Sequence, residues 1–160
     1  MASDELDKVE LPALEQLQSL GWSYIEGAKL SPDESDERSS LKDVVLEKRL
    51  TTSLKRINPW INDENLRKVI RELTKTLYPN LVEANQGIWT QINQCISVMQ
   101  DLGKGNKGQT VHIIDFEHPE NNEFLCTNQF KVSGTEQNII PDILCFVNGL
   151  PLAVIECKSP

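Results

Sequence analysis

Apolar positions follow a helical spacing through the first hundred residues and a strand-like spacing through the last fifty. A leucine repeat from Leu14 to Leu20 predicts a short helix that ends at Gly21, a residue suited to the left-handed position after a helix. Residues 22–25 favour a short extended piece. The run 31–40 holds no apolar residue and predicts a loop.

Longer apolar stripes predict three further helices, at residues 41–57, 63–77 and 80–100. Asn62 or Asp63 is placed to cap the second of these helices. The glycine- and lysine-rich segment 103–108 has no strand before it and lacks the Gly-Lys-Ser/Thr ending of a phosphate loop, so it indicates a flexible connector.

Runs rich in β-branched and aromatic residues then predict four strands, at residues 110–116, 123–132, 139–147 and 151–158. A turn is expected at 118–122, and shorter turns at Ser133-Gly134 and Asn148-Gly149. The last strand is apolar without alternation, which indicates a central strand covered on both faces. Helices followed by a mostly antiparallel sheet predict an α/β or α+β fold with the helices packed on the sheet.

Charge is distributed unevenly along the 160 residues, whose net charge is −8. Residues 1–37 hold ten acidic and two basic residues, whereas residues 38–75 hold ten basic and five acidic ones. The basic stretch is interpreted first as a solvated helix face, with phosphate contact as the alternative. We therefore expect an acidic leader with a short helix and loop over 1–40 and one domain over 41–160, with helices to 100 and the sheet at 110–158.

The four cysteines are scattered and form no CxxC pair, and three of them lie in strand-like apolar runs. Reduced core cysteines are therefore expected, and a zinc site is not. No apolar stretch reaches the length of a membrane span, and the acidic N-terminus does not resemble a signal peptide. These features indicate a cytoplasmic protein with no membrane partner.

The candidate chemistry lies on the last two strands. Asp142 follows Pro141, and fourteen residues later Glu156 and Lys158 flank Cys157. Residues two apart on a strand share a face, so Glu156 and Lys158 point one way and Cys157 the other. Glu-x-Lys alone is a common triplet, and a surface salt bridge is the competing interpretation.

Whether Asp142 meets Glu156 depends on the hairpin between them. A strict two-residue turn at Asn148-Gly149 pairs Asp142 with Ile155, which puts the two carboxylates on opposite faces. An odd loop or one bulge reverses that parity. We therefore predict an irregularity between Val147 and Glu156.

With the carboxylates on one face, Asp142 and Glu156 are candidate ligands of Mg²⁺, and the backbone carbonyl of Cys157 can add an oxygen. This combination of groups suits metal-assisted cleavage of a phosphodiester. In that reaction Lys158 is placed to orient the attacking water or to stabilise the phosphorane oxygens, so that the catalytic set is Asp142, Glu156 and Lys158. Glu83 is a candidate further ligand from a helix, as is Glu47, although an exposed helix carboxylate is the simpler interpretation of each. His112 and His118 are assigned no role.

A run of linked motifs then resembles one known family. The matching segments are Ile114-Asp115-Phe116, Pro119-Glu120-Asn121-Asn122, Asn128-Gln129-Phe130, Pro141-Asp142-Ile143, Phe146–Leu152 and Val154-Ile155-Glu156-x-Lys158. They resemble the N-terminal nuclease domain of type I restriction enzyme R subunits, and the strongest match covers residues 110–160.

The resemblance implies a PD-(D/E)xK nuclease core: a restriction-endonuclease-like mixed sheet with helices packed on it, here expected to stop after the Glu-x-Lys strand. It implies a type I site-specific deoxyribonuclease that cuts double-stranded DNA with Mg²⁺, using Asp142, Glu156 and Lys158. It also implies ATP-driven translocation by a motor elsewhere in the subunit, so ATP is a cofactor of the full-length subunit only. Modification and specificity subunits are the implied partners.

Two alternatives remain open from the sequence. A chain that ends soon after Lys158 is also consistent with an inert fragment that serves as a DNA-binding or subunit-docking module. A stand-alone nuclease of the same core, acting in repair or phage defence, is the third.

Overall fold

The computed structural model describes residues 6–74, 80–134 and 136–158. The chain folds into two compact units: Met1–Lys48 together with Glu123–Pro160, and Arg49–Asn122. None of the helices in the described ranges combines the length and the apolar character needed to cross a lipid bilayer.

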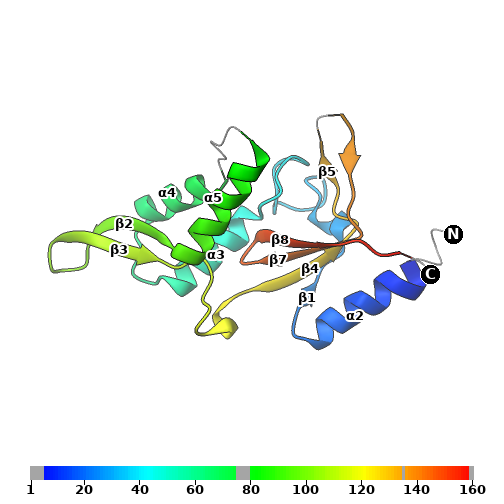
Figure 1. Ribbon diagram of the computed structural model, residues 1–160, viewed down its shortest axis with the longest axis horizontal. Helices are drawn as coiled ribbons and strands as arrows, with labels where there is room; N and C mark the ends of the chain where they lie inside the picture. Colours follow the sequence, from blue (N-terminus) through cyan, green and yellow to red (C-terminus); the bar gives the residue numbers. More distant parts are fainter. Residues whose placement is uncertain (1–5, 75–79, 135, 159–160) are drawn as a thin grey trace. The chain divides into compact units, whose positions relative to one another are not determined.

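The first unit is built on a four-stranded sheet with the order β1-β4-β7-β8 (Figure 1). Its strands are β1 (Ser23–Tyr24), β4 (Phe124–Asn128), β7 (Ile143–Val147) and β8 (Leu150–Ile155). β1 pairs with β4 in parallel, whereas β4, β7 and β8 pair antiparallel. The sheet is therefore mixed, and with the helices it confirms the predicted α+β class.

Short elements complete this unit. They are the π-helical turn η1 (Leu6–Glu10), α2 (Leu11–Ser19), the 3₁₀ turn η2 (Gly27–Leu30) and the two-stranded ribbon of β5 (Val132–Ser133) and β6 (Asn138–Ile139). The predicted short helix is confirmed as α2. It ends at Ser19, and Gly21, two residues later, has a positive φ of 96°. β1 confirms the extended piece, and residues 31–40 form turns and bends without a helix or strand.

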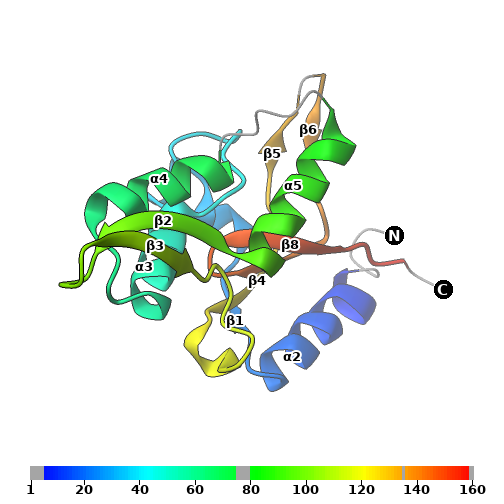
Figure 2. The same ribbon diagram turned by 60° about the vertical axis from the view of Figure 1, so that its left-hand side comes forward.

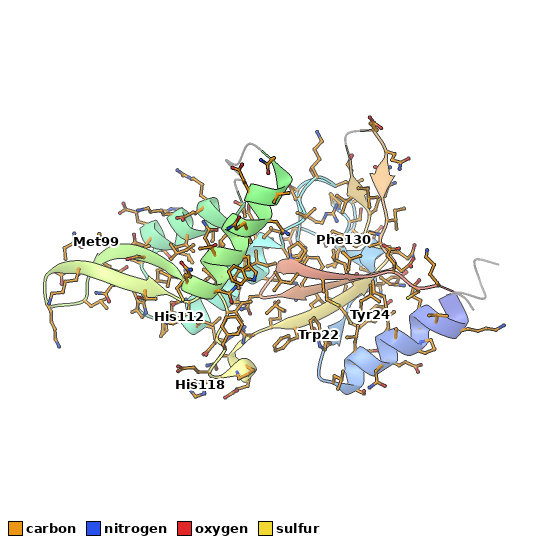
Figure 3. All side chains as sticks on the ribbon, viewed as in Figure 1. Trp22, Tyr24, Met99, His112, His118 and Phe130 are labelled. Carbon is orange, nitrogen blue, oxygen red and sulfur yellow. The ribbon has the colours of Figure 1, made fainter. Side chains whose placement is uncertain are left out.

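Each face of the sheet carries its own core cluster. On one face the buried members are Leu14, Cys126, Ile143, Cys145 and Cys157, with Trp22 and Tyr24 packed against them. On the other face they are Leu30, Leu46, Leu125, Phe130, Leu144 and Phe146. Figure 3 shows Trp22 and Tyr24 toward α2 and Phe130 on the far side of the strands. Part of the stretch expected to be a leader, residues 9–30, thus contributes to the core.

Three of the four cysteines confirm the expectation of reduced core thiols. Cys126, Cys145 and Cys157 are free and buried in the first unit. Cys95, in the second unit, is free and partly exposed.

The prediction of a central final strand is wrong. β8 lies at the edge of the described sheet, where β7 is its one partner. Leu152, Val154 and Ile155 are 43%, 57% and 37% exposed. An unbroken apolar run is compatible with any strand position, because the neighbours that cover a strand are not encoded in the strand itself.

The second unit contains α3 (Glu47–Ile57, whose first two residues belong to the first unit), α4 (Asp63–Thr74), α5 (Leu81–Gln94), the hairpin β2 (Ile96–Asp101) and β3 (Asn106–Val111), and the 3₁₀ turn η3 (Pro119–Asn121). α4 packs beside β2 (Figure 2). Asn62 caps α4 as predicted, because its Oδ1 accepts the backbone N–H of Asn65 at 2.8 Å. Residues 75–77 of the predicted helix lie outside the described ranges.

The predicted helix 80–100 is wrong in its last third. α5 ends at Gln94, and Cys95 then adopts a positive φ of 64°. From Ile96 the side chains alternate between buried and exposed, as expected of a strand with one covered face. The spacing of Ile92, Cys95 and Met99 also fits a helix, and for this reason the apolar pattern predicted a helix that continues past Gln94.

Two other boundaries also differ from prediction. The helix expected over 41–57 begins at Glu47, because Leu46 is fully buried and its N–H donates to the carbonyl of Gly149 at 2.9 Å. The expected connector 103–108 is instead a hairpin turn whose last three residues begin β3.

The strand predicted at 110–116 ends at Val111. The side chain of Asn58 donates to the carbonyl of His112 at 2.8 Å and accepts its N–H at 2.9 Å. A side-chain amide thus takes the hydrogen bonds that a neighbouring strand would otherwise make.

Candidate functional site

The candidate site is built at the open end of the β7–β8 hairpin. The turn consists of Asn148 and Gly149 with φ values of 54° and 82°, so Val147 pairs directly with Leu150. Asn and Gly are the residues that tolerate such left-handed conformations in two-residue hairpins. The backbone N–H of Glu123 donates to Oδ1 of Asn148 at 2.8 Å and ties the turn to the start of β4.

A bulge interrupts the ladder beyond the turn. Phe146 pairs with Pro151, but Cys145 pairs with Ala153, so Leu152 is the extra residue on β8. The next pairs are Leu144 with Val154 and Ile143 with Ile155. The predicted irregularity is therefore confirmed, and it takes the form of a bulge next to a strict two-residue turn.

The bulge sets which side chains share a face. Continuing the register one step beyond Ile143 and Ile155 places Asp142 opposite Glu156. Directly opposed residues of an antiparallel pair project to the same side of the sheet. Lys158, two residues after Glu156, follows the same alternation, and both of these side chains are exposed.

Cys157 points to the other face, as predicted. Its side chain is 5% exposed and belongs to the core cluster that contains Leu14 and Ile143. The middle residue of Glu-x-Lys therefore anchors the end of β8 in the core while its neighbours remain open to solvent.

Asp142 is hydrogen-bonded to the segments that follow both neighbouring strands, β8 and β4. Its Oδ2 accepts the backbone N–H of Cys157 at 2.7 Å, across the gap to β8. Its carbonyl accepts the backbone N–H of Gln129 at 3.1 Å, from the end of β4. An N–H donated to a carboxylate is a strong, charge-assisted hydrogen bond, so this side chain is well oriented.

A further carboxylate near this end of the sheet was missed by sequence reasoning. Glu10, at the end of η1, is only 4% exposed and accepts side-chain hydrogen bonds from Asn128 and Gln129 at 2.8 and 3.3 Å. The sequence shows it as one of ten acidic residues among the first 37, and nothing in that spacing distinguishes it.

Glu83 and Glu47 lie in helices and are exposed. Glu83 caps α5: its N–H donates to Oδ1 of Asn80 at 2.9 Å, and its Oε1 accepts from Nδ2 of Asn80 at 2.8 Å. His112 Nδ1 lies 3.4 Å from Sγ of Cys95, and His118 Nδ1 lies 3.7 Å from Oε1 of Glu120.

The donor set at the hairpin suits a hard divalent cation. Within the described ranges, no group of three or more His, Cys, Asp or Glu side chains is gathered to hold a metal ion. Mg²⁺ commonly uses one or two carboxylates and keeps several waters, so the pair of Asp142 and Glu156 fits it by ligand type.

Comparison with known proteins gives one consistent family. The sequence model of the family described as type I restriction enzyme R protein N terminus matches residues 3–160. A putative type I restriction enzyme MjaIXP endonuclease subunit from Methanocaldococcus jannaschii is 35% identical over 155 residues. The type I restriction enzyme HindI endonuclease subunit from Haemophilus influenzae is 34% identical over 154 residues.

Each of these alignments covers 95% of this chain and 15% of the relative, so the chain spans about one seventh of their length. The resemblance seen in the motifs thus extends over nearly all of the sequence. The chain belongs to the family of type I restriction enzyme R protein N-terminal domains.

Proposed function

We propose that this chain is the Mg²⁺-dependent endonuclease domain of a type I restriction enzyme R subunit and that it cleaves double-stranded DNA. The observation that supports the proposal is the bulged register, since its continuation past Ile143 and Ile155 sets Asp142 opposite Glu156. Lys158 follows two residues later and is exposed, as Glu156 is. The names of the relatives, which are endonuclease subunits, support the same reaction.

In this proposal Asp142 and Glu156 hold Mg²⁺, with the carbonyl of Cys157 as a further oxygen ligand. When bound, the ion supplies an acidified water and neutralises charge on the phosphate. The hydrogen bond from Cys157 N–H fixes Oδ2 of Asp142 and thereby orients the whole carboxylate. Glu83 is retained as a proposed additional ligand only.

Lys158 acts on the phosphate in this proposal. A compact ammonium on a flexible stem reaches a developing oxyanion or the attacking water from the same face as the carboxylates. In the absence of a cation, its positive charge also offsets the repulsion between Asp142 and Glu156.

The wider setting is also proposed from the family. The cleavage follows ATP-driven translocation by a motor outside this chain, within a cytoplasmic complex that contains modification and specificity subunits. ATP is accordingly a cofactor of the longer subunit.

Calorimetric titration with Mn²⁺, followed by a plasmid-nicking assay with Mg²⁺, tests the proposal. We expect Asp142→Ala to abolish the binding heat, and Lys158→Ala to retain binding but lose nicking. Lys131→Ala, which removes another exposed lysine of the same unit, is the matched control and should behave as the wild type.

If the wild type and Asp142→Ala give the same negligible heat, the proposal fails and the inert DNA-binding or docking module is favoured. Nicking should also be measured in a longer chain that continues past Pro160. Equal nicking there by Lys158→Ala and the wild type would contradict the role of the lysine.

A further inference from the structure

Glu10 is a buried carboxylate that accepts hydrogen bonds from two neutral side-chain amides. Its Oε1 accepts from Nδ2 of Asn128 at 2.8 Å, and its Oε2 accepts from Nε2 of Gln129 at 3.3 Å. The hydroxyl of Tyr24 donates to Oδ1 of Asn128 at 2.7 Å and continues the chain of hydrogen bonds. Burying a carboxylate is costly unless such donors satisfy it, so its place here calls for an explanation.

The two amides that Glu10 holds belong to consecutive residues at a sharp change of direction. Asn128 is the last residue of β4, and Gln129 has a positive φ of 51°. This conformation is uncommon for a residue other than glycine. The carboxylate thus binds the side chains of the two residues that flank one peptide bond, at the point where the chain leaves the sheet.

The same segment is tightly enclosed from a third direction. A Cβ added to Gly27 would collide with the backbone of both Asn128 and Gln129. Little room is therefore left for this turn to shift while Glu10 holds it.

This turn is joined directly to Asp142. The backbone N–H of Gln129 donates to the carbonyl of Asp142 at 3.1 Å, while the carboxylate of Asp142 accepts the N–H of Cys157. Any displacement of Gln129 is thus transmitted to the backbone of the carboxylate that the proposed function assigns to the cation.

We infer that Glu10 is a positioning residue for the metal site: it clamps Asn128 and Gln129, and through the N–H of Gln129 it fixes Asp142. Glu10 does not itself bind the ion in this scheme. The inference rests on the proposed function, since it assumes that Asp142 is a cation ligand.

Mn²⁺ titration calorimetry on the 160-residue chain tests the clamp. Glu10→Gln keeps the shape but sets an amide against the two amide donors, so we expect about tenfold weaker Mn²⁺ binding, as found for outer partners of metal ligands. The exchanged pair Glu10→Gln with Gln129→Glu restores one donor and one acceptor and should recover most of the affinity. Glu15→Gln, at an exposed position of α2, is the control and should change nothing.

A second readout does not require the metal. The amide resonance of Cys157 reports the carboxylate of Asp142 that accepts its proton. Its chemical shift should change in Glu10→Gln, return to the wild-type value in the exchanged pair and remain unchanged in Glu15→Gln. Gln129→Ala removes one arm of the clamp at an exposed side chain and should weaken Mn²⁺ binding even if Glu10→Gln does not fold.

The possible failures are distinguishable. If the wild type binds no Mn²⁺, the proposed function falls and the inference falls with it. If the wild type binds but Glu10→Gln and Gln129→Ala match it, only the clamp is refuted. If Glu10→Gln and the exchanged pair lose binding equally, Glu10 is a direct ligand and the positioning role is overturned.

Discussion

The carboxylate of Asp142 accepts the backbone N–H of Cys157 at 2.7 Å, just beyond the paired parts of β7 and β8. This bond runs between the two motifs of the candidate site and closes the open end of the hairpin. It depends on the bulge, since the register between these residues is shifted by the extra Leu152.

Insertion of one alanine after Leu152 is therefore expected to destroy the site without altering any of its chemical groups. With one more residue on β8 beside a single bulge, Asp142 is opposed by Ile155, and Glu156 shifts to the other face. Mn²⁺ binding should fall to that of Asp142→Ala, as measured by calorimetry. Deletion of Leu152 leaves a regular hairpin in which Asp142 still opposes Glu156, so this control should bind like the wild type, and tight binding by the insertion variant would contradict this account.

Removal of the Phe130 ring should destabilise the first unit strongly. Phe130 is fully buried, meets Phe146 edge-to-face at 5.4 Å between ring centroids, and lies under the Arg38 guanidinium at 4.2 Å. Phe130→Ala should cost about 3–5 kcal/mol of unfolding free energy, measured by urea denaturation. Phe116→Ala, at a ring that is 63% exposed, should stay within about 0.5 kcal/mol.

A methyl group at Gly27 should also destabilise the fold. The added carbon meets the backbone of Asn128 and Gln129, which cannot swing aside as a flexible side chain would. We expect Gly27→Ala to cost roughly 1–3 kcal/mol in thermal or urea unfolding. Gly108→Ala, whose new contact is the Ser97 hydroxyl at 3.4 Å, is the control, and equal losses in the two variants would refute the explanation.

Thiol labelling should separate one cysteine from the other three. Burial raises the pKa of Cys126 to about 11, so at pH 8 only about one in a thousand of its thiols is ionised. The thiolate fraction grows as the pH rises toward that pKa, so labelling should accelerate with pH. At pH 8 Cys95 should react first and the buried thiols only on unfolding, and Cys95→Ser should remove the early phase. Four equally fast thiols in the native protein would contradict the structure.

Part of the candidate site could be predicted from the sequence alone. Asp142 and Glu156 could be predicted as partners, and so could the need for an irregularity between them, because strand alternation is a fixed geometric rule. That the irregularity is a bulge at Leu152 depends on side-chain packing, which the local sequence does not specify.

Other features were hidden for physical reasons. α5 ends where Cys95 adopts a positive φ, and a cysteine does not predict this conformation because it is uncommon for residues other than glycine. The partners of Glu10 are more than a hundred residues away, so its burial has no local signal. The edge position of β8 depends on its neighbours in the sheet.

The hairpin that carries Asp142 and Glu156 also bears on the order in which the molecule folds. Its strands are joined by two residues, so the loop-closure entropy is small and the pairing should form early. The bond between Glu10 and Asn128 closes a separation of 118 residues and should form late. Asp142 and Glu156 are then brought together early, in a nascent hairpin. The N-terminal segment that carries Glu10 adds its hydrogen bonds only at the last stage of folding.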